Sequence, residues 1–109
     1  MIICTTLGPG GTVGGGLGKA HDVAVAEVTD GRVSSWEEHE VAWDRLHDEG
    51  TEGAHHARIV RFLREHGVET VVARGIGPGM QRTLGSMGVS TVLGVEGDAR
   101  EVVARAASA

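Results

Sequence analysis

Histidines that could bind a metal are concentrated in one acidic stretch of the sequence. Four of them fall between positions 39 and 56, namely His39, His47, His55 and His56. Imidazole is a common ligand of transition metals at neutral pH, so these four residues are the first candidate metal site. Their spacing matches no standard zinc pattern, and the alternative that they are solvated polar residues stays open.

His55 and His56 are adjacent, which limits how they can act together. On a helix their side chains point about 100 degrees apart, so one of the pair is expected to face a ligand while the other is solvated. His47 could join from the loop if that loop folds back. His21 follows a glycine-rich segment and could approach the site, whereas His66, directly before a helix-ending glycine, is expected to lie at a helix C-terminus.

Two glycine-rich segments supply a second kind of candidate site. Residues 7–18 contain seven glycines and one proline, which predicts a loop too flexible for regular structure. Arg74 and the sequence Gly-Ile-Gly-Pro-Gly at 75–79 precede a predicted helix, where free backbone N–H groups and the helix dipole favour an anion. Arg74 would add a positive charge. The alternative is that these glycines only permit a tight strand-to-helix turn.

The candidate cofactor-binding residues therefore come from both glycine-rich segments. They are Gly16, Leu17, Gly18, Arg74, Gly75, Ile76, Gly77, Pro78 and Gly79.

Length and composition limit the class of protein. The 109 residues, 40% of them hydrophobic, predict a single domain over 1–109. The only cysteine, Cys4, excludes an internal disulfide, is expected to be a buried small hydrophobic residue, and favours a cytoplasmic location. No apolar run is long enough to span a membrane, and a net charge of -5 disfavours nucleic acid as a partner.

The chain divides into short strands and helices that would position these residues. Apolar runs predict strands at 2–6, 22–28, 70–73 and 89–93, and Asp30-Gly31 predicts a hairpin leading to an edge strand from Arg32 to Trp36. Helices are expected at 54–66, from Pro78 to a stop at Gly88, and after Asp98. Residues 40–53 are expected to form a loop with one helical turn near Trp43.

This order of elements predicts an α/β fold with a five-stranded mixed sheet. Right-handed crossovers would give the strand order 3-2-1-4-5, with strand 2 antiparallel. The first and fourth strands would then flank the switch point of the sheet, where ligands of open α/β sheets bind. The two glycine-rich segments follow these two strands and are expected to meet there.

Several segments together resemble the dinitrogenase iron-molybdenum cofactor accessory family. They are Val13 to Ala20, Asp30-Gly31, Glu65 to Val68, Gly75 to Pro78, and Gly88-Val89 followed by Val92 to Gly94. The resemblance covers roughly residues 13–105 and is most specific in the strand, Gly-Ile-Gly-Pro and helix segment. It implies a three-layer α/β/α, ribonuclease-H-like fold and a role in holding, delivering or storing a metallocluster, without catalysis.

The chain departs from the family near the ligand. Leu17 stands where family members often carry an aromatic residue, Gly16 stands where a histidine sometimes precedes it, and Arg74 replaces a small residue. Because of these departures, the expected ligand is not restricted to the nitrogenase cofactor. It is an iron-sulfur or molybdenum-containing metallocluster, or a single transition metal.

The leading hypothesis is a small non-catalytic carrier or chaperone of a metallocluster or transition metal. Its partners would be a metallocluster donor or acceptor protein, with the chain a monomer or weak homodimer. Strand 2–6 has no carboxylates for a two-metal nuclease, and the hydrolase and phosphate-loop motifs are missing. The alternatives are a regulatory module that binds a phosphate- or anion-bearing metabolite without metal, and a structural interaction domain.

Overall fold

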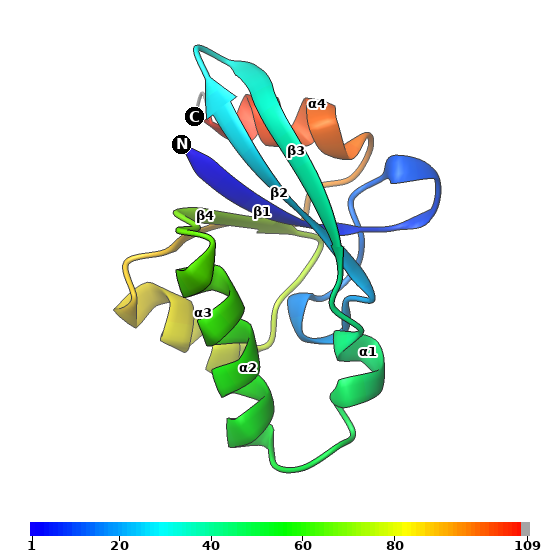
Figure 1. The fold of residues 1–109 in the computed structure, drawn as a ribbon, viewed down its shortest axis with the longest axis vertical. Coiled ribbons are helices and arrows are strands. Elements are labelled where there is room, and N and C mark those ends of the chain that lie inside the picture. The colour runs from blue at the N-terminus through cyan, green and yellow to red at the C-terminus, as the bar shows by residue number, and fades with distance from the viewer. Residues whose placement is uncertain (108–109) are drawn as a thin grey trace.

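The computed structural model describes residues 1–107 as a five-stranded mixed sheet with helices on both faces (Figure 1). The strands are β1 (Ile2–Leu7), β2 (Asp22–Thr29), β3 (Arg32–Glu40), β4 (Thr70–Ala73) and β5 (Ser90–Leu93). The helices are α1 (Trp43–Leu46), α2 (Glu52–Glu65), α3 (Pro78–Ser86) and α4 (Ala99–Ala107). Residues 108 and 109 of the predicted domain lie outside the described residues. None of the described helices is long and apolar enough to cross a membrane.

The sheet has the order β3-β2-β1-β4-β5, which confirms the predicted topology. β2 runs antiparallel to both neighbours, while β1, β4 and β5 are mutually parallel. β1 therefore has an antiparallel neighbour on one side and a parallel neighbour on the other. The carboxyl ends of β1 and β4 lie together, and both glycine-rich segments leave the sheet from this edge.

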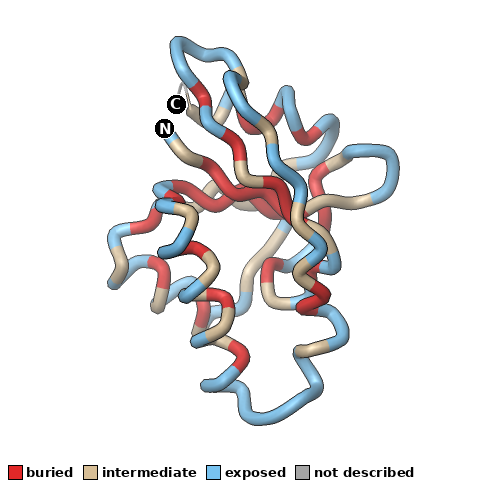
Figure 2. Tube along the Cα trace, viewed as in Figure 1, coloured by how far each residue is buried: buried red, intermediate tan, exposed pale blue. Residues whose placement is uncertain are grey.

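The hydrophobic core consists of two layers, one on each face of the sheet. Alternation along β1 places Cys4 in the layer under α1, α2 and α3, and Ile3 in the layer under α4. All four residues of β4 are buried, as expected for a central parallel strand covered on both faces. Figure 2 shows this buried centre of the sheet, with the loop between α1 and α2 exposed. The predicted three-layer arrangement is confirmed.

Two predicted boundaries differ from the structure by two residues or more. β3 continues to Glu40, because its pairing with β2 extends as far as Asp22 opposite Glu40. α2 begins at Glu52, two residues before the predicted start, because the Thr51 side chain accepts a hydrogen bond from the Ala54 N–H at 3.1 Å and caps the helix.

The prediction that residues 7–18 are too flexible for regular structure was wrong. This segment contains two short 3-10 turns, Pro9–Gly11 and Leu17–Lys19. It folds back on β1, where the Gly14 N–H donates to the Thr6 carbonyl at 3.0 Å and the Thr6 hydroxyl donates to the Gly15 carbonyl at 3.3 Å. A Cβ atom at Gly14 would lie 2.8 Å from the carbonyl carbon and oxygen of Leu7, so the glycine permits close backbone packing.

Candidate functional site

The two glycine-rich segments meet at the carboxyl ends of β1 and β4. Gly16 and Gly75 pair in an isolated parallel bridge, and the Arg74 N–H donates to the Gly14 carbonyl at 3.3 Å. The expectation that the segments converge at the switch point of the sheet is therefore confirmed. A Cβ at Gly16 would lie 4.0 Å from the Gly75 carbonyl oxygen and one at Gly75 would meet nothing within 4 Å, so this pairing does not depend on the absence of side chains.

A cavity of about 610 Å³ opens beside this junction. Its volume lies within the range of small-molecule and cofactor sites. The lining comes from the second half of the first glycine segment, from the α1–α2 region and from the start of α3. The lining residues are Gly16, Leu17, Gly18, Lys19, His47, Glu52, His55, His56, Gly75, Ile76, Gly77 and Met80.

The wall formed by the start of α3 suits an anion. Gly77 is the N-cap residue and supplies no side-chain hydrogen bond, and the first turn contains no acidic residue. Pro78 has no N–H, so the N–H groups of Gly79 and Met80 and the positive end of the dipole are what the helix itself leaves without compensation. Lys19 contributes a positive charge to the lining.

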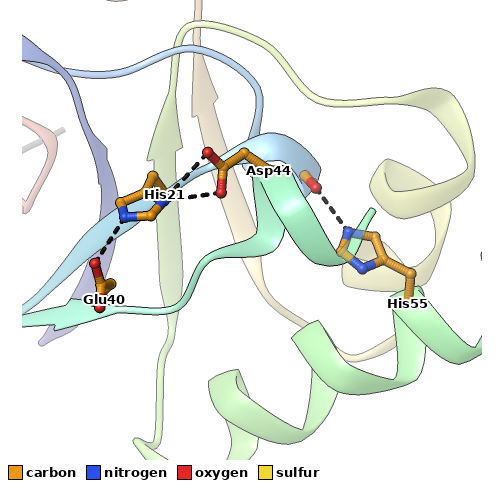
Figure 3. Close-up of polar contacts among 5 residues, drawn as sticks. His21, Glu40, Asp44 and His55 are labelled. Atoms are coloured by element: carbon orange, nitrogen blue, oxygen red, sulfur yellow. Dashed lines mark hydrogen bonds and ion pairs between the residues drawn. The ribbon is translucent and has the colours of Figure 1, made fainter. Parts of the chain in front are cut away.

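His55 holds the cavity wall together through both of its ring nitrogens. Its side chain belongs to the buried stripe of α2 with Ile59 and Leu63, spaced four residues apart. Arg58 Nη1 lies 2.8 Å from Nδ1. The Gly18 carbonyl oxygen lies 2.7 Å from Nε2, which is the contact drawn from His55 in Figure 3. Because arginine only donates, Nδ1 accepts and Nε2 carries the proton. His55 therefore has no free lone pair for a metal in this arrangement.

His47 and His56 are the cavity histidines with a ring nitrogen available for a ligand. His56 Nε2 lies 3.8 Å from a Glu52 carboxylate oxygen, an ion-pair contact longer than a hydrogen bond. The His56 ring lies against the start of α3, where a Cβ at Gly79 would come within 3.3 Å of its Cε1. His47 packs edge-on against the His55 ring at 5.3 Å between centroids, and its Nδ1 lies 3.3 Å from Asp48.

Some predicted site residues lie outside the cavity lining. The Arg74 guanidinium is exposed and forms an ion pair with Glu96 at 3.2 Å, so its charge is directed to the β5–α4 connection. Pro78 and Gly79 lie in the first turn of α3 but do not line the cavity. The earlier half of the glycine segment packs on the other face of the sheet, where the Val13 N–H donates to the Gly97 carbonyl at 2.9 Å.

His39 is also separated from the other predicted metal ligands. The sequence grouped it with the histidines around the predicted loop at 40–53, whereas it lies within β3 and packs against Phe62 and His66 at the end of α2. The single predicted group of four histidines is therefore divided. His47, His55 and His56 line the cavity, and His39 does not.

Comparison with known proteins assigns the family. A family model described as dinitrogenase iron-molybdenum cofactor matches residues 1–109, the whole chain. The chain belongs to this family. Membership supports a cofactor-related accessory role and a relation to metalloclusters.

A solved structure shares the fold of this iron-molybdenum cofactor family member. The crystal structure of PH0822 matches with a TM-score of 0.73 and 23% sequence identity, covering 97% of this chain and 88% of that chain. At this identity the likeness shows the fold alone. No curated protein matches the chain.

Sequence reasoning missed three lining residues of this family member. Lys19 directly follows the predicted Gly18, Met80 directly follows the predicted Gly79, and Glu52 begins α2. The first two could have been found by extending each glycine-rich segment by one residue. Glu52 lacked a signal, because its position depends on where α2 starts and how the preceding loop folds back.

His21 lies outside the cavity lining and fastens three segments together. Its Nδ1 contacts Asp44 of α1 at 3.0 Å, and its Nε2 contacts Glu40 of β3 at 2.8 Å (Figure 3). Hydrogen bonds to Asp44 and then to Glu40 are the main reasons that the pKa of His21 is raised. His21 therefore does not line the cavity as expected, and instead it links α1 to β3.

Cys4 is fully buried in the core layer that also contains Leu17 and Met80. Burial raises the pKa of its thiol to about 12. The prediction that Cys4 packs as a small hydrophobic residue is confirmed. No cysteine is among the described lining residues, so the metal-binding side chains around the cavity are imidazoles, the Met80 thioether and the Glu52 carboxylate.

Proposed function

We propose that this protein is a non-catalytic carrier that holds an anionic metallocluster, or a metal–sulfur fragment of one, in the cavity between its two glycine-rich segments. The cargo would be received from one protein and passed to another. The observation that carries the proposal is the start of α3, where Gly77 and Met80 line the cavity, no acidic residue stands in the first turn, and Lys19 belongs to the same lining.

The available ligands suit a cargo that must be released. His47 and His56 can bind a metal through imidazole, and Met80 offers a soft thioether. The cavity otherwise contributes apolar side chains and backbone amides, which bind by shape and hydrogen bonding. Because few metal–protein bonds hold the cargo, a partner with thiolate ligands could remove it without breaking a full protein coordination sphere.

The lining residues also support a role without turnover. Among the described residues that line the cavity there is no serine, threonine or cysteine to act as a nucleophile, and Glu52 is the sole carboxylate. A two-metal hydrolytic site would need several carboxylates around the ions. The proposed activity is therefore binding and transfer.

Uptake of tetrathiomolybdate by the anaerobically purified protein tests this function. We expect about one molybdenum per chain by elemental analysis, and replacing His47 and His56 together by Gln should weaken binding at least about tenfold, or ~1.4 kcal/mol. His21→Gln is the matched control, because it removes an imidazole outside the cavity. Uptake that is absent in the wild type, or equal in all three proteins, would contradict the proposal.

A phosphate-bearing metabolite is the competing ligand, since Lys19 and the start of α3 would also bind a phosphate. Thermal unfolding with inorganic phosphate, ATP or tetrathiomolybdate separates the two ligands, because a ligand of the folded state raises the melting temperature. We expect a shift with tetrathiomolybdate that depends on His47 and His56. A shift with phosphate or ATP that is insensitive to both histidines would favour the metabolite.

A further inference from the structure

Three metal-ligating side chains converge on the face of β3 away from α4, outside the cavity. They are Glu37 and His39 of β3 and His66, which ends α2. One ligand atom from each lies within 4.8 Å of the other two. None of these residues lines the cavity described above.

The fold brings the three side chains together for simple geometric reasons. Residues two apart on a strand share a face, so Glu37 and His39 project on the same side of β3. The C-terminal end of α2 lies over this side and adds His66. Phe62 packs edge-on to the His39 ring at 5.3 Å and lies 4.4 Å from the His66 ring, while the two imidazoles are 4.7 Å apart. Packing around Phe62 thus fixes both rings before any metal arrives.

The Nε2 atom of His39 lacks the partner that a buried nitrogen normally has. It is shielded from solvent and makes no hydrogen bond among the described residues. Glu37 Oε1 lies 2.8 Å away in an ion-pair contact that is not a hydrogen bond. Leaving a buried polar atom without a partner is costly, and a metal ion bound by both Nε2 and the carboxylate would satisfy it.

The space beside these residues can accommodate additional ligands. A small cavity of about 90 Å³ is lined in part by Glu37 and His66 and opens to solvent. A water molecule occupies roughly 30 Å³ in the liquid, so the cavity has room for water at an open coordination position. Ligand atoms on one tetrahedral zinc lie roughly 3.3 Å apart, given bonds of about 2.0–2.1 Å, so small side-chain rotations would close the site.

We propose that Glu37, His39 and His66 form a mononuclear site for a divalent transition cation, best matched by Zn²⁺, with water completing the coordination. Two imidazoles and one carboxylate are a donor set that zinc accepts. The carboxylate makes this site attract cations, in contrast to the anion-suited start of α3. The proposal is independent of the proposed carrier function, since the two sites share no residue.

Titration of the metal-free full-length chain with Co²⁺ tests the site, because Co²⁺ reports its coordination through visible absorption. We expect one Co²⁺ per chain at this site, displaced by Zn²⁺, and at least about tenfold weaker binding in His66→Gln and in Glu37→Gln. Glu37 is exposed, so its variant should keep the fold even if His66→Gln does not. The His47→Gln/His56→Gln protein is the matched control and should retain the signal.

Proton NMR of the imidazole Cε1 hydrogens provides an independent measurement in the wild type. Zn²⁺ should shift the resonances of His39 and His66, while those of His21 stay in place. Unchanged His39 and His66 resonances, or Co²⁺ absorption that is lost only in the His47→Gln/His56→Gln protein, would overturn the proposal. Neither result would affect the uptake of tetrathiomolybdate, so failure of this site is distinguishable from failure of the carrier function.

Discussion

The role that each histidine can play depends on what its two ring nitrogens contact. Those of His55 are both used within the protein, so this residue fastens α2 to the Leu17–Lys19 turn. His56, its neighbour in sequence, keeps a nitrogen available toward the cavity. Adjacent residues of one type thus take different roles, because one helical step turns the side chain by about 100 degrees.

His21 should make stability depend on pH. Its pKa is raised above the ordinary value of 6.5, chiefly by the hydrogen bond to Asp44, while the pKa of Asp44 is lowered below 3.8, chiefly by His21. The raised pKa stabilises the fold below pH 6.5, and this contribution is lost as the pH rises through the folded-state value. The Asp44 contribution is present above pH 3.8 and is lost as the pH falls through its lowered value.

We therefore expect His21→Gln to be less stable than the wild type mainly near pH 5. The difference should become smaller as the pH rises through the raised pKa of His21. Urea unfolding at several pH values measures it, with His47→Gln as the exposed-histidine control. A stability difference that grows with rising pH would contradict the stabilising role of the protonated His21. The pair is exposed, so solvent screening keeps the effect modest.

The glycine-rich segment after β1 is packed against the rest of the protein and is not a loose loop. Its first half pairs with the connection before α4, and its second half forms the cavity wall. Gly14 is the point where it crosses back over β1. The arrangement of the cavity therefore depends on backbone packing at a position outside the cavity itself.

Gly14→Ala should destabilise the protein by about 1–3 kcal/mol, because the added methyl group would meet the Leu7 backbone at 2.8 Å. Gly15→Ala is a closely matched control, since a Cβ at Gly15 meets nothing within 4 Å. Urea unfolding compares the two proteins. If both substitutions had equal effects, the close contact between Gly14 and β1 would not determine the loop conformation.

At the scale of the whole molecule, the sheet separates two core layers. The buried residues of the layer under α4 are aliphatic, while the layer under α1, α2 and α3 also contains Trp43 and Met80. Cys4 lies at the centre of one layer, beneath the helices that form the cavity. Its thiol is out of reach of solvent and has a pKa of about 12. Access to Cys4 therefore reports on opening of the entire core.

A thiol reagent at pH 8 should label native Cys4 at least about 10³-fold more slowly than the unfolded chain, because both access and thiolate formation are suppressed. Labelling by an Ellman-type reagent, with and without urea, measures this ratio. The rate in native buffer should follow unfolding of the core. Rapid labelling of the folded protein would show that Cys4 is reachable from the cavity.

The sequence alone determined the elements and their order. Alternation, continuous apolar runs, the Asp30-Gly31 hairpin and Pro78 at a helix start are local signals, because each depends on neighbours within a few residues. Crossover rules then gave the strand order, and the glycine segments were correctly expected to meet, as they do at Gly16 and Gly75. The family resemblance predicted the same fold, and the family assignment was confirmed.

Only the tertiary structure decided which side chain meets which. Arg74 pairs with Glu96, His55 turns into the protein, and His39 joins His66, although nothing near these residues in sequence indicates the partner. A side chain's environment is set by how distant elements pack, including the fold-back of α2 over β3. Local patterns therefore locate the candidate site, and long-range packing assigns the role of each residue in it.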